Sequence, residues 1–529
     1  MKHFSYILFA LACWSIIGCK KTLEKTPLAQ IEEANAYVSA DDARRAVTAA
    51  YAPTAGNNWC CTYIQPGYMH WVLGNVASDD TEKGGESGSD QLYAQQVSLF
   101  NIPSDNDATR FAWQVEYVGI RRTNLVLDKV SKIEMDAALR NRYLAEAKFL
   151  RAWYYFNLVR TFGDVPLILS SEITTFDMVR TPKQEVYNQI IKDLTEAESV
   201  LPERSGYAAA DHGRATKGAA QAYLGKVYLY LKNYLKAEEW FLKVLPPPVG
   251  TSTQYELDPD YLGMFFRGDQ NTNLRNGTRP LTSAGELSKE HIFQVKFVND
   301  AGASPANNNN IGTTFGSRAR NGWGFNLPTQ DFVNEFEPGD PRLGHTVYKN
   351  GDIMPEGETA NVGNSTTGYL TKKYYVPRPE FINGSIQAGR DDIYMRVGKA
   401  MLWYAEAANE NGNTAAALKA LNEVRRRARE TGPNRANVQL TVLPPVTETN
   451  KDALRQLIWH EQRVEFGQEY ERFFELVRQG RAGTVLRAYA AKYNTSKGQG
   501  FREGVNEVFP VPQLEINLSK GKITQNPGY

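Results

Sequence analysis

The chain has 529 residues, with 60 lysines and arginines against 59 aspartates and glutamates, and a formal net charge of +1. Its 42% hydrophobic and 22% charged content excludes a globally disordered chain, and the even charge balance excludes a broad basic surface for nucleic acid. At roughly 150 residues per domain, this length would suit three or four domains. Composition therefore predicts a neutral, globular, tyrosine-rich protein and leaves its function open.

The N-terminus has the pattern of an export signal. Lys2 precedes a mostly apolar run from 4 to 17, which is shorter than the roughly 20 residues that cross a bilayer core. The run ends in Ile16-Ile17-Gly18-Cys19, which resembles the lipobox of bacterial lipoproteins. This resemblance implies a signal peptide over 1–18, a lipid with palmitate among its acyl chains on Cys19, and a lipid-anchored tether over 19–35. The alternative is an ordinary signal peptide that contains a cysteine.

Helical periodicity begins well after the tether. Between 139 and 160, large and small apolar residues recur at spacings of three and four, which predicts one helix that stops at Gly163 and Pro166. The next helix is expected to open at Thr181-Pro182-Lys183-Gln184, a capping-box pattern with proline at the first helical position. Residues 451 to about 481 are expected to form a terminal helical region.

Two further segments, 217–248 and 396–430, predict helical hairpins. In the first, Leu224, Tyr228, Ala237 and Phe241 fall at the offsets of a tetratricopeptide repeat, in which small residues let two antiparallel helices approach closely. The second hairpin fits the same offsets more weakly. Generic helical hairpins are the alternative for both.

Residues 250–390 differ in character from the rest. This stretch holds 18 of the 42 glycines, and short β-like runs such as 292–298 are embedded in it. We expect a mainly α fold in which a scaffold of tetratricopeptide-like hairpins carries a loop-rich, partly β inserted subdomain. The expected organisation is a signal peptide at 1–18, a tether at 19–35, an N-terminal helical region at 36–249, the insertion at 250–390 and a C-terminal helical region at 391–529.

Several separated motifs resemble the SusD/RagB family of Bacteroidetes surface lipoproteins, in family order. They are Arg142-Tyr143-Leu144-Ala145-Glu146-Ala147 with Phe162-Gly163-Asp164-Val165-Pro166-Leu167, Arg214-Ala215-Thr216-Lys217-Gly218, Tyr404-Ala405-Glu406-Ala407, Glu461-Gln462-Arg463-Val464-Glu465-Phe466 and the terminal Gln525-Asn526-Pro527-Gly528-Tyr529. Gln462 departs from the family, which has arginine after the first glutamate.

This resemblance implies a nutrient-binding lipoprotein of the outer membrane that faces the cell exterior. Such a protein captures glycans, or peptides in some members, and hands them to a TonB-dependent transporter barrel of the SusC type, on which it sits like a lid. We expect the tetratricopeptide-like helices to hold this barrel and to contribute little to ligand contact. A secreted carbohydrate-active enzyme and a pure protein-interaction scaffold are the alternatives.

A search for catalytic chemistry supports the binding-protein interpretation. Glu461 and Glu465 lie one helical turn apart and could act as an acid/base pair, but ion pairs that fix helix packing are the preferred interpretation. His460 lacks the second histidine of a zinc-peptidase helix, and the adjacent Cys60 and Cys61 make a poor zinc site. That cysteine pair is either a strained disulfide or two small buried residues. We expect no catalytic residue, metal or cofactor.

Two loop-like regions mix aromatic and polar side chains, which is what a glycan site needs. Sugars present apolar C–H faces ringed by hydroxyls, so they bind flat aromatic rings beside carboxylates, amides or guanidinium groups. The candidate ligand-binding residues are Trp323, Trp59, Trp71, Tyr68, Tyr63, Arg320 and Asp79. Trp323 is the strongest candidate because glycines on both sides leave its ring uncrowded in a mobile segment. The alternative is that these rings pack the loops onto the scaffold.

Overall fold

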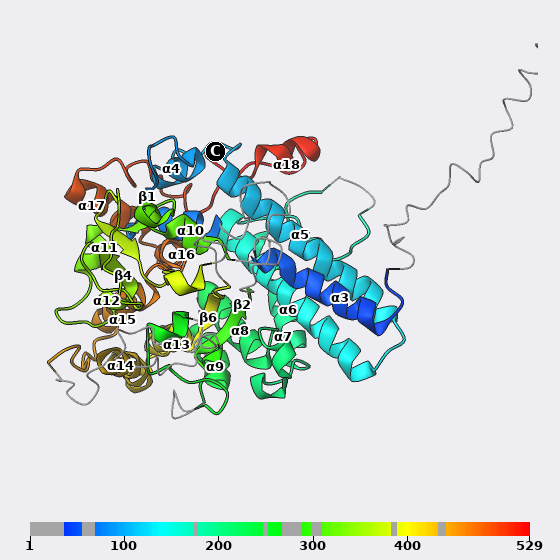
Figure 1. The fold of residues 1–529 in the computed structure, drawn as a ribbon. Helices are drawn as coiled ribbons and strands as arrows, with labels where there is room; N and C mark the ends of the chain where they lie inside the picture. Colours follow the sequence, from blue (N-terminus) through cyan, green and yellow to red (C-terminus); the bar gives the residue numbers. More distant parts are fainter. Residues whose placement is uncertain are drawn as a thin grey trace, which may run out of the picture.

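The computed structural model describes residues 36–55, 69–173, 178–246, 252–266, 287–297, 309–381, 389–431 and 441–529. Figure 1 shows a mainly helical molecule in which the inserted segment lies to one side of the long N-terminal helices. The predicted fold class is confirmed. Several sequence predictions fall outside the described residues, namely the signal peptide 1–18, Cys19, the tether, Trp59, Cys60, Cys61, Tyr63 and Tyr68.

Helices dominate the described part of the chain, and short strands lie between them. The helices are α3 (Ala40–Tyr51), α4 (Leu92–Ser98), α5 (Asp107–Lys129), α6 (Ala137–Phe162), α7 (Lys183–Glu198), α8 (Lys217–Tyr230), α9 (Tyr234–Val244), α10 (Ile311–Phe315), α11 (Gln330–Asn334), α12 (Leu343–Thr346), α13 (Val397–Glu410), α14 (Thr414–Glu430), α15 (Lys451–Phe466), α16 (Arg472–Arg478), α17 (Ala482–Tyr493) and α18 (Gln513–Leu518). The strands are β1 (Thr81–Gly84), β2 (His291–Val295), β3 (Phe325–Pro328), β4 (Val347–Lys349), β5 (Tyr369–Thr371) and β6 (Asp392–Arg396).

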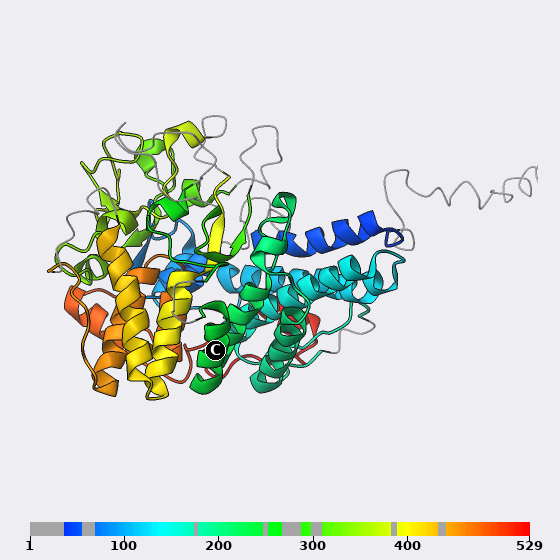
Figure 2. The same cartoon turned by 90° about the horizontal axis from the view of Figure 1, so that it is seen from below.

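Three long helices, α3, α5 and α6, lie side by side at the N-terminal end of the described chain (Figures 1 and 2). The side chain of Asp136 caps α6 by accepting from the backbone N–H of Leu139, and Gly163 ends the helix with φ of 74°. That conformation is left-handed and favours glycine. Most residues of α6 beyond Tyr143 are buried, so the helix runs through the centre of the molecule.

The start of α7 differs from its prediction. Pro182 occupies the N-cap position, and no side chain caps this end. Thr181 instead forms an isolated β-bridge with Val165, and its hydroxyl accepts from the backbone N–H of Leu167 at 3.3 Å. The predicted capping box is therefore wrong, because tertiary contacts with the segment after α6 use the threonine.

The two predicted hairpins are confirmed as α8–α9 and α13–α14, and α13 also packs on α9, so the hairpins stack. Close packing explains why α8 carries a glycine at position 225. A Cβ at Gly225 of α8 would lie 2.8 Å from the ring of Phe241 in α9, closer than van der Waals contact allows. The C-terminal region continues as α15, α16 and α17, with α15 packed against α13 and α14. Among the described residues, no helix combines the length and apolarity needed to span a bilayer.

Short antiparallel strand pairs attach the insertion to both helical regions. β1 pairs with β3, with Thr81 opposite Pro328, and joins the N-terminal region to the insertion. β2 pairs with β6, which leads directly into α13, whereas β4 and β5 pair within the insertion. The insertion is therefore held at two places far apart in sequence.

Candidate functional site

Trp323 lies on the surface of the insertion with 37% of its area exposed. Its own backbone is fixed, because its N–H donates to the carbonyl of Thr313 in α10 at 2.7 Å. The N–H of Gly322 donates to Ser317 and that of Gly324 to Gly316, both at 2.9 Å. The ring therefore projects from a hydrogen-bonded turn, where the sequence suggested a mobile segment.

The glycines on either side of Trp323 are required by this turn. A Cβ at Gly322 would lie 2.2 Å from the carbonyl oxygen of Gly316, which is main chain and cannot rotate away. Gly324 has φ of +67°, and its carbonyl accepts from the N–H of Gly85 just after β1. The turn is thus anchored to α10 on one side and to the β1 connection on the other.

Arginines of the same segment and of a neighbouring one are paired with carboxylates. Arg318 lies 3.1 Å from Asp90 and 3.7 Å from Glu86, which follow β1. Arg320 lies 3.2 Å from Glu356, and a second arginine of the insertion, Arg378, pairs with Glu358. We call Trp323, Arg318, Arg320, Glu356, Glu358, Arg378 and Phe381, together with Glu86 and Asp90, the Trp323 surface.

Aromatic rings support the arginines of the Trp323 surface. The Arg320 guanidinium lies 4.5 Å from the ring centre of Tyr375 and 5.0 Å from that of Phe381, which is half-buried. Such cation–π contacts hold a guanidinium in place while leaving its edge able to donate. Burial raises the pKa of the Tyr375 hydroxyl, which stays protonated and donates to Glu356.

The structure does not support Trp71 as a ligand platform. Only 2% of its surface is exposed, and its ring packs against Phe315 and Phe325 at centroid distances of 5.7 and 5.8 Å. These two partners lie about 250 residues away in sequence, next to the Trp323 turn. Trp71 thus belongs to the core that carries the turn.

Asp79 is also buried, and two arginines occupy its carboxylate. Arg463 and Arg472 each approach its Oδ2 at 2.9 Å. Burial alone would raise the pKa of Asp79, but these two guanidinium groups hold it well below the usual range. Asp79 therefore fixes the segment before β1 onto α15 and α16, and we leave it out of the ligand surface.

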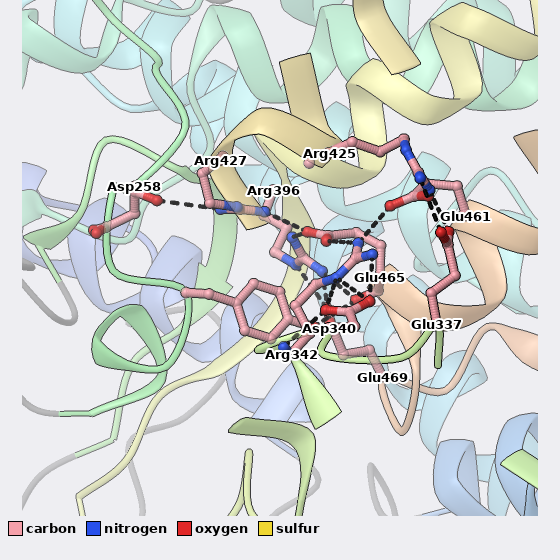
Figure 3. Close-up of polar contacts among 12 residues, drawn as sticks. Asp258, Glu337, Asp340, Arg342, Arg396, Arg425, Arg427, Glu461, Glu465 and Glu469 are labelled. Carbon is pink, nitrogen blue, oxygen red and sulfur yellow. Dashed lines mark hydrogen bonds and ion pairs between the residues drawn. The ribbon is translucent and has the colours of Figure 1, made fainter. Parts of the chain in front are cut away.

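A buried charge cluster joins the insertion to the C-terminal helices (Figure 3). Glu465 of α15 lies 2.7 Å from Arg396, lies 3.0 Å from Arg342 and accepts from Arg427. Burial alone would raise the pKa of Glu465, but Arg427, Arg396 and Arg342 together lower it to about 2. The carboxylate is therefore ionised and fully paired, so it cannot serve as a general base near neutral pH.

Glu461 has the same structural role one turn earlier, so the ion-pair interpretation of these two glutamates agrees with the structure. Its two oxygens lie 2.6 Å from Arg342 and 2.8 Å from Arg425. Glu337, His460 and Glu461 place possible metal-ligand atoms within 4.8 Å of one another, but Arg425 also lies 2.6 Å from Glu337. The Arg425 guanidinium therefore already pairs with both carboxylates of this group.

A groove of about 610 Å³ lies between α5, the segment 166–173 and α18. Apolar side chains such as Trp113, Ile168, Ile173 and Leu518 form most of its lining. In both views α5 and α18 lie away from the insertion that carries Trp323 (Figures 1 and 2). The Trp113 ring in this lining is only 3% exposed and offers no free face to a sugar, so we place the ligand at the exposed Trp323 instead.

Family models match two long parts of the chain. Residues 289–529 match the model described as SusD family, and residues 60–229 match one described as "Starch-binding associating with outer membrane". The chain belongs to the SusD family. The SusD-like protein P2 of Formosa agariphila is similar to it at 24% identity, with 99% of each chain covered. The starch-binding protein SusD of Bacteroides thetaiotaomicron is 28% identical over 45% of this chain and 41% of its own length.

Solved SusD-like structures share the fold over nearly all of the chain. A laminarin-binding SusD-like protein has 28% identity and a TM-score of 0.74, covering 93% of this chain and all of that one. The surface glycan-binding protein A of Bacteroides thetaiotaomicron in complex with laminarihexaose has 22% identity and a TM-score of 0.75, covering 92% and 100%. The family resemblance of the sequence motifs is therefore confirmed.

Within the SusD-family scaffold, the sequence singled out Trp323 and Arg320 as candidates but did not indicate the residues that surround Arg320. Glu356, Glu358 and Phe381 come from another part of the insertion and contact Arg320, and Arg378 joins them through Glu356 and Glu358. The one available signal was the mixture of charged and aromatic residues between 356 and 381.

Proposed function

We propose that this protein captures oligosaccharides or polysaccharides at the cell surface and hands them to a TonB-dependent outer-membrane transporter. Family membership supports a binding role, and relatives are named for binding starch, laminarin and laminarihexaose. The observation that carries the proposal is Trp323, an exposed indole on a hydrogen-bonded turn. An exposed, fixed aromatic ring is what stacking on a sugar face requires.

The Trp323 surface also provides the polar groups that would surround a stacked sugar. Glu358, 36% exposed, and Arg378, 54% exposed, offer acceptor and donor groups to sugar hydroxyls. Arg320 and Glu356 lie deeper and hold the aromatic side of the surface together. In this proposal Trp323 stacks on the ligand and Arg320 positions its neighbours.

The deciding experiment measures glycan binding by Trp323→Ala. A glycan array that includes laminarihexaose and starch oligosaccharides first identifies a ligand of the parent protein, and calorimetry then compares variants. We expect the substitution to cost about 1–3 kcal/mol of binding free energy, by analogy with base stacking on aromatic rings. Trp240→Ala is the matched control, since Trp240 is half-buried on α9 in the helical scaffold. Equal binding by parent and Trp323→Ala, with both folded, would contradict the proposed site.

The cellular setting of this proposal includes a lipid anchor at Cys19 and attachment to the outer membrane, facing outward. The lipobox-like motif supports the anchor, and the description of the N-terminal family model supports the membrane. The stacked hairpins α8–α9 and α13–α14 offer a continuous helical surface for a protein partner. We propose that this surface, and not the Trp323 surface, contacts the transporter.

A further inference from the structure

We infer that the Trp323 surface selects uncharged glycans and excludes those that carry uronate or sulfate groups. The inference rests on the proposed function and specifies the ligand class of the same site. It follows because the arginines and the lysine of this surface already form ion pairs or hydrogen bonds with protein acceptors.

The arginines of the Trp323 surface are all paired with acids. Arg318 is shared by Asp90 and Glu86, Arg320 by Glu356 and Glu358, and Arg378 is bonded to Glu358. Proteins recognise carboxylate, sulfate and phosphate groups with guanidinium groups whose N–H donors are available to the anion. Because the charge of each arginine is already balanced by a protein carboxylate, an anionic sugar would have to compete with that carboxylate. A neutral hydroxyl can accept from an outer N–H of Arg378 without breaking its ion pair.

The lysine of this region is engaged as well. Lys83 of β1 is buried, and its Nζ donates to the carbonyls of Ser87 at 2.8 Å and Asp90 at 2.5 Å. Within the described residues 83–90 and 318–324, the cations are Lys83, Arg318 and Arg320, and each has protein acceptors. No cation of these two described segments is left to attract an anionic ligand.

Exposure of the acids adds a repulsive contribution. Glu86 beside Arg318 is 74% exposed, whereas the Arg318 side chain is only 26% exposed. A sulfate that approached this end of the surface would meet a carboxylate before it met the guanidinium. Like charges at short range disfavour binding, so the pairs supply specificity against anionic polymers.

The test compares neutral and anionic probes on matched variants. The neutral probes are laminarihexaose and maltohexaose, and the anionic probes are oligogalacturonate and a sulfated galactan oligosaccharide, each measured at low and high NaCl. The double variant Glu86→Gln with Asp90→Asn leaves Arg318 without its acids but keeps hydrogen-bonding side chains. The control is Glu423→Gln with Glu430→Gln on α14, which likewise releases one exposed arginine, Arg426, from two acids.

We expect the parent to bind a neutral probe with an affinity that changes by less than about twofold between the two salt concentrations, because no net charge pairing is formed. The Glu86→Gln, Asp90→Asn variant should gain binding to an anionic probe, and high salt should remove that binding. The α14 control should show no such gain.

Trp323-dependent binding of an anionic probe by the parent would overturn the inference while leaving the proposed function intact. A parent that binds a neutral probe, with no gain in the double variant, would also overturn it. Failure of the parent to bind any glycan, neutral or anionic, would overturn the proposed function itself.

Discussion

Arg396 of β6 and Glu465 of α15 form an ion pair with 2.7 Å between Nη1 and Oε1, and neither side chain has exposed surface. Arg396 also lies 2.8 Å from Glu290, which immediately precedes β2. The pair therefore connects the β2–β6 sheet to the terminal helical region at one buried point. Because isolated charges are very costly inside a protein, each member depends on the others.

Glu465→Gln should destabilise the fold strongly. The substitution leaves Arg396, Arg342 and Arg427 short of one buried negative charge, and breaking such a pair from one side costs about 3–5 kcal/mol. Urea denaturation of parent and variant measures the difference in free energy of unfolding. Glu430→Gln, which removes an acid from the exposed pair with Arg426, should change that free energy by less than about 1 kcal/mol. Similar effects of the two substitutions would contradict this account of the cluster.

The contribution of Glu465 should also depend on pH. Its pKa is lowered from an ordinary 4.5 to about 2 in the folded protein, so the folded state favours the ionised form. The stabilisation is then fully present above the unfolded pKa and is lost as pH falls from 4.5 towards 2. The gap in unfolding free energy between parent and Glu465→Gln should accordingly shrink between pH 5 and pH 3. A constant gap over this range would show that the charge of Glu465 does not carry the effect.

The sequence predicted the helical scaffold well because its signals are local. The apolar spacing of α6, its stop at Gly163 and the small Gly225 facing Phe241 are all set by nearby residues. Trp71 could not be assigned in this way, since its ring partners Phe315 and Phe325 come from the insertion. The same limit applies to Thr181, whose bridge with Val165 replaced a locally plausible cap. Long-range contacts decided each of these differences.

The C-terminal motif supports a second stability prediction. The buried side chain of Asn526 donates to the carbonyls of Phe162 at 3.0 Å and Phe509 at 2.7 Å, and it accepts from Arg180. Asn526→Ala should cost about 1–3 kcal/mol or more, because buried carbonyls and a guanidinium lose their partner. Thermal unfolding compares it with Asn517→Ala, an exposed asparagine of α18. Equal melting temperatures for the two variants would contradict the prediction.

Lipidation at Cys19 gives a prediction about localisation. If the lipobox-like motif is processed, Cys19→Ala removes the acylated thiol, and the protein should move from the detergent phase to the aqueous phase on partitioning. Cys13→Ala is the control, because that residue would leave with the signal peptide. Intact mass spectrometry of the membrane-bound protein should show an acylated N-terminal cysteine. Continued membrane attachment of Cys19→Ala would argue against a lipid anchor at this residue.

A substitution in the turn that carries Trp323 should weaken glycan binding without destabilising the fold. Gly322→Ala places a Cβ 2.2 Å from the Gly316 carbonyl oxygen, so the turn must shift and carry the indole with it. Since a stacking contact is worth about 1–3 kcal/mol, we expect glycan affinity to fall by about tenfold while the scaffold melts close to the parent temperature. Gly344→Ala in α12 is the matched control in the same insertion, because no atom lies within 4 Å of its added Cβ. Calorimetric titration with the glycan that binds the parent measures both variants. If Gly322→Ala binds as tightly as Gly344→Ala, the fixed position of Trp323 has no part in ligand capture.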